Sequence, residues 1–179
     1  MAANPTKLLV SRMEALVCIK IQGKATFASS VDFKRLLTEL IHHGTTKIVI
    51  DLAECPLMDS TFLGVMAGAG LQLRDESKAA QESGNCDGVL RLLNPQERVI
   101  DSLESLGMTH LFHVMTASVD QPGRFEEVKL GEITKLENTR TCLEAHRLLM
   151  DLNTNNVSKF QDVATFLAED LKRLEVTPR

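Results

Sequence analysis

DLAECPLMDSTFLGVMAGAG, residues 51–70, has the pattern of a buried strand that ends in a short turn and passes into a helix. The strand is the run KIVIDL, residues 47–52, which is apolar on both faces, as expected of a central parallel strand covered by helices. Asp and Ser are ordinary N-cap residues, so the helix is expected to start at Asp59, Ser60 and Thr61. A serine hydroxyl at such a position can be modified by a kinase, because free N–H groups and the helix dipole stabilise an added phosphate.

Two strands and a helix are predicted before this stretch. Alternating and β-branched residues predict strands at 8–10 and 15–21, joined by a polar turn into an antiparallel hairpin. A helix then starts at Ser29 and Ser30, and its apolar side chains recur at the spacing of one buried stripe. Gly44 is expected to end this helix.

Further strands and helices are predicted after the stretch. Gly64 and Gly68 lie four residues apart in the helix that follows the turn, where they allow a neighbour to approach closely. The polar residues 75–88 are predicted to form a loop. The remaining elements are a strand at 89–93, a helix opened by Asn94, Pro95 and Glu97 and ended by Gly107, and a last strand at 111–115. This order predicts an α/β fold with a mixed sheet of about five strands and helices.

The motif and the order of elements resemble the STAS domain family, the family of sulfate transporters and anti-sigma factor antagonists. The antagonists carry an Asp-Ser-Ser/Thr-x-Leu-Gly motif at the end of a parallel strand. In this sequence the motif reads Asp59, Ser60, Thr61, Phe62, Leu63 and Gly64. The resemblance implies a STAS-like domain over residues 1–122, followed by a helical extension over residues 123–179.

The resemblance also assigns roles to the motif. It implies that Ser60 is the phosphorylated residue, with Thr61 as a weaker second candidate, and that Asp59, Ser60, Thr61 and Phe62 bind the partner. That partner would be an anti-sigma factor, or a switch serine kinase of histidine-kinase-like fold. Phe62 stands where many of these antagonists carry Gly, so its ring either anchors the helix start in the core or changes the surface offered to a partner. From the residues alone a plain N-cap role for Ser60 is the simpler interpretation, and the resemblance favours phosphorylation.

Charge at Ser60 is expected to affect binding more than folding. Phosphate would add about −1.5 to −2 charges beside Asp59, and at a docked interface these charges must be desolvated or face a like charge. Each repulsion of about 1.4 kcal/mol lowers affinity tenfold, so a few kcal/mol suffice for an on/off switch.

Composition and motifs exclude several other functions. A net charge of −4 with dispersed Lys and Arg offers no attraction to nucleic acid. No apolar run suits a bilayer span, and the first ten residues lack the apolar core of a signal peptide, so we expect a cytoplasmic protein without direct membrane insertion. The four cysteines form no CxxC pair and the histidines show no ligand spacing, so neither a metal nor a cofactor is expected. No phosphate-loop or hydrolase motif occurs, which predicts that the protein is not an enzyme.

The C-terminal extension is predicted to be a pair of helices. Its second helix has a clean apolar stripe from Val157 to Leu174, opened by a capping box at Ser158 and Gln161, and residues 153–156 form the turn between the helices. The pair is expected to pack on the domain or on a second copy, and of the two we favour a homodimer. Cys142 and His146, in the first helix, are interpreted as packing residues.

Three functional hypotheses follow. The leading one is a regulatory protein-binding module, resembling an anti-sigma factor antagonist, that is switched by phosphorylation of Ser60. The second is a non-phosphorylated STAS adaptor subunit of a transport or signalling complex. The third is a phosphocarrier that uses one of the histidines.

Overall fold

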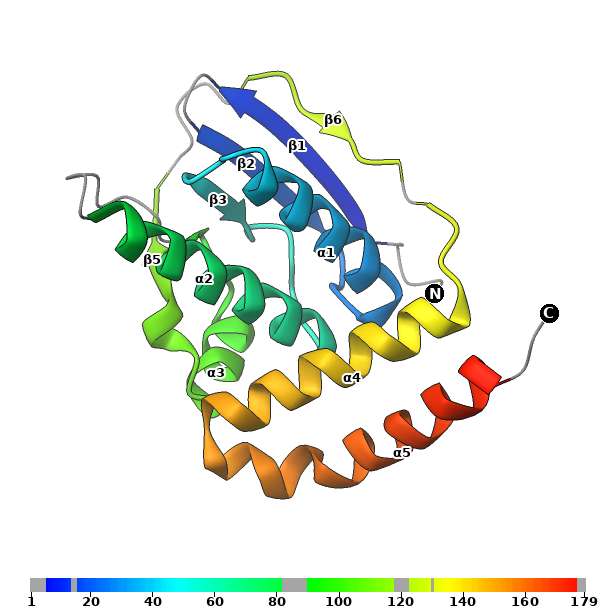
Figure 1. The fold of residues 1–179 in the computed structure, drawn as a ribbon. Helices are drawn as coiled ribbons and strands as arrows, with labels where there is room; N and C mark the ends of the chain where they lie inside the picture. Colours follow the sequence, from blue (N-terminus) through cyan, green and yellow to red (C-terminus); the bar gives the residue numbers. More distant parts are fainter. Residues whose placement is uncertain (1–5, 14–15, 82–89, 118–122, 130, 177–179) are drawn as a thin grey trace.

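The computed structural model describes residues 6–13, 16–81, 90–117, 123–129 and 131–176, and its α/β architecture is drawn in Figure 1. The strands are β1 (Lys7–Met13), β2 (Leu16–Gln22), β3 (Ile48–Asp51), β4 (Leu90–Leu93), β5 (Phe112–Met115) and β6 (Glu126–Glu127). The α-helices are α1 (Phe27–His42), α2 (Ser60–Gln81), α3 (Glu97–Ser105), α4 (Lys135–Leu152) and α5 (Val157–Val176). The predicted order of elements up to β5 is confirmed.

The sheet is mixed and has the order β5-β4-β3-β2-β1-β6. β2 to β5 are parallel to one another, and β1 is antiparallel to both β2 and β6. The predicted sheet lacks β6, so the prediction that the strand ending at Met115 is the last one is wrong. β6 consists of two exposed glutamates, which carry neither alternation nor β-branched side chains and so give no strand signal.

The helices form layers in front of the sheet. α1 and α2 lie side by side, α4 crosses the starts of both, and α5 packs along the outer side of α4 (Figure 1). Phe33 of α1 and Phe62 of α2 stack with their ring centroids 4.3 Å apart, and both are fully buried. Of the two roles that the sequence left open for the Phe62 ring, the structure therefore shows the anchor in the core.

Several predicted ends of helices and strands are wrong, because residue types that favour caps and turns occupy other backbone positions in the structure. β1 extends to Met13, into the residues predicted as the turn between the first two strands, whereas β2 starts at Leu16, within its predicted range. Ser29 and Ser30 lie inside α1, where their hydroxyls donate to the carbonyls of Thr26 and Phe27 instead of capping the helix. Asn94 adopts a φ of 49° and exchanges hydrogen bonds with Ala117, so Gln96 takes the cap position of α3. Gly44 and Gly107 follow α1 and α3 with positive φ, as predicted.

The polar segment predicted as a loop is partly helical. α2 continues to Gln81, and the rest of that prediction, residues 82–88, lies outside the described residues. A polar helix end that faces solvent has the same composition as a loop, so residue type alone does not separate the two.

The C-terminal hairpin of two helices is confirmed, although its caps differ from the prediction. The capping box belongs to α4, where Thr134 and Glu137 bond each other's backbone N–H groups, and the predicted box at Ser158 and Gln161 is wrong. A short 3₁₀ turn at Thr154–Asn156 joins the helices. α4 packs on α2 of the domain, whereas 42% of the Val163 side chain in the predicted stripe of α5 stays exposed. No helix in the described parts of the chain is long and apolar enough to cross a membrane.

Candidate functional site

The junction between β3 and α2 is fixed by Asp59. Its Oδ1 accepts a hydrogen bond from the backbone N–H of Phe62 at 2.9 Å, as an N-cap should. Its Oδ2 accepts a second bond, at 2.6 Å, from the backbone N–H of Phe27 at the start of α1. One carboxylate thus satisfies free N–H groups of two helices and holds both starts together, which sets the position of the next residue, Ser60.

Replacing Asp59 by Ala is expected to destabilise the fold by about 1–3 kcal/mol, because a cap and a second charge-assisted bond are lost together. For a chain of this size that is a fall in thermal midpoint of about 2–4 °C per kcal/mol. Differential scanning calorimetry measures it, with Asp101→Ala on the exposed face of α3 as the matched control. Equal midpoints for the two variants would show that Asp59 does not tie the helices.

Ser60 is the first residue of α2, and its hydroxyl contacts α4. The Ser60 Oγ lies 2.9 Å from Nε2 of His146, and His146 Nδ1 lies 2.7 Å from the carbonyl oxygen of Cys142. A carbonyl only accepts, so Nδ1 carries the hydrogen and donates it. In the neutral ring this leaves Nε2 to accept the hydroxyl proton of Ser60. The candidate phosphoacceptor is therefore engaged by a residue 86 positions away.

Thr61 and Phe62 are less accessible than the motif predicts. Thr61 is buried, and its hydroxyl donates to Cys142 Sγ at 3.7 Å. The Phe62 ring is fully buried, so in this conformation it offers no surface to a partner. Asp59 and Ser60 are partly accessible, whereas Thr61 and Phe62 are buried, and the contact of residues 59–62 with a partner stays a prediction.

His146 is the site residue that the sequence analysis missed. Its side chain is buried, its ring centroid lies 5.0 Å from that of Phe160 of α5 with the two ring planes tilted by 56°, and its Nε2 atom contacts Ser60. A histidine on the apolar stripe of a helix gives the same sequence signal as a packing residue. Only the docking of α4 on the start of α2 brings it to the motif.

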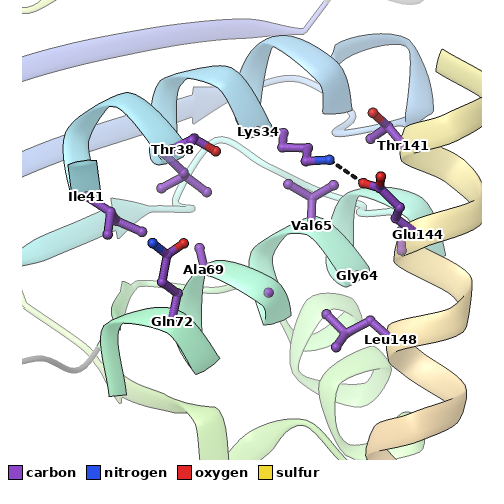
Figure 2. Close-up of a pocket in the computed structure, with 13 residues that line it drawn as sticks. Lys34, Thr38, Ile41, Gly64, Val65, Ala69, Gln72, Thr141, Glu144 and Leu148 are labelled. Carbon is purple, nitrogen blue, oxygen red and sulfur yellow. Dashed lines mark hydrogen bonds and ion pairs between the residues drawn. The ribbon is translucent and has the colours of Figure 1, made fainter. Parts of the chain in front are cut away.

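Two ion pairs fasten α4 to α1. Lys34 pairs with Glu144, as drawn in Figure 2, and Arg35 pairs with Glu137 at 2.6 Å. The hydrogen bond to Arg35 lowers the pKa of Glu137, and the same bond raises the pKa of Arg35. The side chains of both pairs are substantially exposed, so salt screens them and their contribution to stability is small.

A cavity of about 240 Å³ lies between α1, α2 and α4 (Figure 2). At one end of it the helices touch: a Cβ added to Gly64 would lie 2.7 Å from the Cβ and the carbonyl oxygen of Ala145. The predicted close approach at Gly64 is thus confirmed, and the neighbour is α4. At Gly68, one turn along, an added Cβ would meet only the end of the Leu148 side chain at 3.4 Å.

The family model of the STAS domain matches residues 8–121 of this chain. The match runs from β1 past β5 and includes the Asp59–Ser60 junction at the start of α2. The chain belongs to the STAS domain family. α4 and α5 lie beyond the matched STAS segment. A comparison with the sequences of curated proteins found no match.

Solved structures resemble the STAS fold of this chain at low sequence identity. Protein TM1081 of Thermotoga maritima has a TM-score of 0.48 and 19% identity, over 62% of this chain and 86% of its own. The anti-sigma factor antagonist SpoIIAA in its unphosphorylated form has a TM-score of 0.48 and 21% identity, over 63% of this chain and 89% of its own. Phosphorylated SpoIIAA of Bacillus has a TM-score of 0.47 and 21% identity, over 64% and 93%.

The cysteines among the described residues form no second site. Cys18, Cys55 and Cys142 are free and buried, and Cys86 lies outside the described residues. Burial raises the pKa of Cys18 to about 11 and also raises the pKa values of Cys55 and Cys142, so their thiols stay protonated at neutral pH. Among the described residues no group of His, Cys, Asp and Glu could hold a metal ion.

Proposed function

We propose that this STAS protein is a regulatory binding module that is switched by phosphorylation of Ser60. In the unmodified state it binds an anti-sigma factor or a switch serine kinase of histidine-kinase-like fold. The kinase transfers phosphate to the Ser60 hydroxyl, and the modified protein releases its partner. The chain itself contributes no catalysis to this scheme.

The observation that carries the proposal is the position of the Ser60 hydroxyl. It is on the first residue of a 22-residue helix that Asp59 caps, at the end of a central parallel strand. The free N–H groups and the dipole at a helix N-terminus favour an anion, typically by about 0.3–1 kcal/mol at an exposed position. The start of α2 itself therefore tolerates a phosphate on Ser60.

The same phosphate opposes a docked partner. It would add about −1.5 to −2 charges next to the Asp59 carboxylate, in a chain whose net charge is already −4. A partner that carries acidic groups at the contact, or that desolvates the start of α2, then loses affinity while the fold keeps its stability. Phosphorylation is therefore expected to change partner affinity and not the stability of the fold.

Capture of the partner from the protein's own cells tests the proposal. The tagged full chain is isolated, its copurifying proteins are identified, and its phosphate is mapped by mass spectrometry. The proposal predicts acid-stable phosphoserine at residue 60 and an ATP-binding partner that phosphorylates the purified chain. A stable membrane complex with unmodified Ser60 would favour the adaptor subunit instead, and acid-labile phosphate on a histidine would favour the phosphocarrier.

A cytoplasmic location, the domain division at residue 122 and the homodimer stay predictions. The apolar side chains that a second copy would cover are those that α5 leaves in solvent, of which Phe166 is 64% exposed. The division at residue 122 has to accommodate β6, since that strand follows it in the chain and pairs with β1 of the domain.

A further inference from the structure

The α4–α5 hairpin lies on the residue that the proposed function modifies. The Ser60 hydroxyl is 2.9 Å from His146 of α4, and Thr61 contacts Cys142 of the same helix. A contact of this length leaves no room between Ser60 and α4 for a phosphoryl group or a partner's side chain. We infer that the hairpin, residues 135–176, is a built-in cover that competes with the kinase and the partner for the start of α2. This inference rests on the proposed function of Ser60.

Phosphoryl transfer has a geometric requirement that the covered site does not meet. The attacking oxygen must approach the phosphorus in line, at about 3–3.5 Å, inside the active site of the kinase. The Ser60 hydroxyl is instead directed at His146. Ser60 also borders an open cavity of about 370 Å³ that is lined by residues of α2, α3 and α5, among them Leu63, Ser102 and Phe160. An ordinary protein interface covers about 800 Å² on each partner, so one centred on Ser60 would overlap the hairpin.

Part of the interface between the hairpin and the domain is weakly packed, as expected of an interface that can open. Its ion pairs to Lys34 and Arg35 are exposed, and a cavity of about 240 Å³ interrupts the packing between α4 and the domain. Leu149 of α4, in contrast, is fully buried in the core. The closed state therefore dominates, and opening is a local event.

The fraction of molecules in which the cover is open sets both the partner affinity and the rate of Ser60 phosphorylation. When only a fraction of the molecules is open, the apparent dissociation constant for the partner is the intrinsic constant divided by that fraction. Anything that lifts the hairpin tenfold more often then strengthens partner binding about tenfold, and speeds phosphorylation of Ser60 by the same factor. The partner itself favours the open state, because it binds that state alone.

The glycines of α2 offer a matched pair of variants. Gly64→Ala adds a methyl group that would lie 2.7 Å from the backbone and Cβ of Ala145, so α4 has to move away. Gly68→Ala adds the same group one turn along the same helix, where it meets a flexible side-chain end at 3.4 Å. Alanine favours the α2 helix in both variants. The two full-length proteins thus differ in how strongly the added methyl group displaces α4.

Alkylation by iodoacetamide reports opening without any partner. Cys142 belongs to the cover and is buried on the face of α4 that contacts Thr61, while Cys18 and Cys55 lie in the domain core and report global unfolding. Mass spectrometry resolves the sites, which keeps Cys86 separate. We expect Gly64→Ala to raise the labelling rate of Cys142 at least tenfold, Gly68→Ala to change it less than twofold, and both to leave the other two rates unchanged.

A charge reversal provides a second test that does not touch the core. Glu144→Lys faces Lys34, and the repulsion should raise Cys142 labelling about two- to fivefold, the range of an exposed ion pair. Adding Lys34→Glu in the double variant restores an opposite-charge pair, so its labelling rate should return to that of the unmodified chain.

Phosphate occupancy of Ser60 in the protein's own cells completes the experiment. The cover predicts higher occupancy for Gly64→Ala than for Gly68→Ala, together with faster Cys142 labelling. Labelling of Cys142 that is unchanged, or that rises only with Cys18 and Cys55, overturns the cover. Equal Ser60 phosphate in all variants despite faster labelling also overturns it but leaves the proposed function intact. An absence of phosphate from Ser60 in every variant rejects the proposed function, and the regulation inferred here with it.

Discussion

Ser60→Glu is expected to weaken partner binding at least tenfold and to leave the fold nearly as stable as before. The carboxylate stands next to Asp59 and imitates the charge of a phosphate, so the partner meets repulsion at the contact, and tenfold in affinity corresponds to about 1.4 kcal/mol. In the free protein the variant loses one hydrogen bond to His146, of about 1 kcal/mol, and gains from a negative charge at the helix N-terminus. The thermal midpoint should stay within about 2–4 °C.

Ser60→Gln is the matched control, because it has nearly the same shape without the charge and loses the same bond to His146. Isothermal titration calorimetry with the captured partner gives the three dissociation constants. If Ser60→Glu binds weakly and Ser60→Gln binds like the unmodified chain, charge is the cause. If both variants bind as weakly, shape at the start of α2 decides, and if both bind like the unmodified chain, the adaptor interpretation gains support.

Phe62→Ala is expected to destabilise the fold by about 3–5 kcal/mol, the usual cost of removing a buried aromatic ring. The ring stacks on Phe33 at 4.3 Å, both side chains are fully buried, and no partner contact is available to it in this conformation. The effect should therefore appear in the free protein as a lower urea midpoint with an unchanged m-value.

Phe166→Ala on α5 is the control for this loss, since the same atoms are removed from a ring that is 64% exposed. We expect its free energy of unfolding to change by no more than about 0.5 kcal/mol. A Phe62→Ala protein as stable as Phe166→Ala, with impaired partner binding, would instead mean that Phe62 belongs to the contact surface.

The start of α2 could be predicted from sequence because its determinants are local. A two-faced apolar strand, a short turn and Asp59 as a cap lie within a few residues of one another, and each favours the same backbone path. The cap of α3 has the same kind of local signal, yet the prediction of Asn94 as the cap is wrong, because Gln96 takes that position. Asn94 adopts a positive φ because its side chain bonds Ala117, 23 residues later, and that long-range bond decided where the helix starts.

The contact between Ser60 and His146 could not be predicted, because it depends on how the hairpin docks. The apolar pattern predicts that α4 exists and that one face is buried, but it does not say against what. Gly64 carries the one usable signal, a place for close approach, and Ala145, the residue it meets, is next to His146 in the chain. Knowledge of that pairing would have placed His146 at the motif.

Phosphopeptide mapping tests the central claim most directly. The full chain is incubated with the captured kinase and ATP beside its Ser60→Ala and Thr61→Val variants, and the peptide that contains residues 51–74 is sequenced by mass spectrometry. The account predicts phosphate on Ser60, incorporation at least tenfold lower in Ser60→Ala, and incorporation in Thr61→Val close to that of the unmodified chain. Phosphate at another residue, or unchanged incorporation in Ser60→Ala, would contradict it.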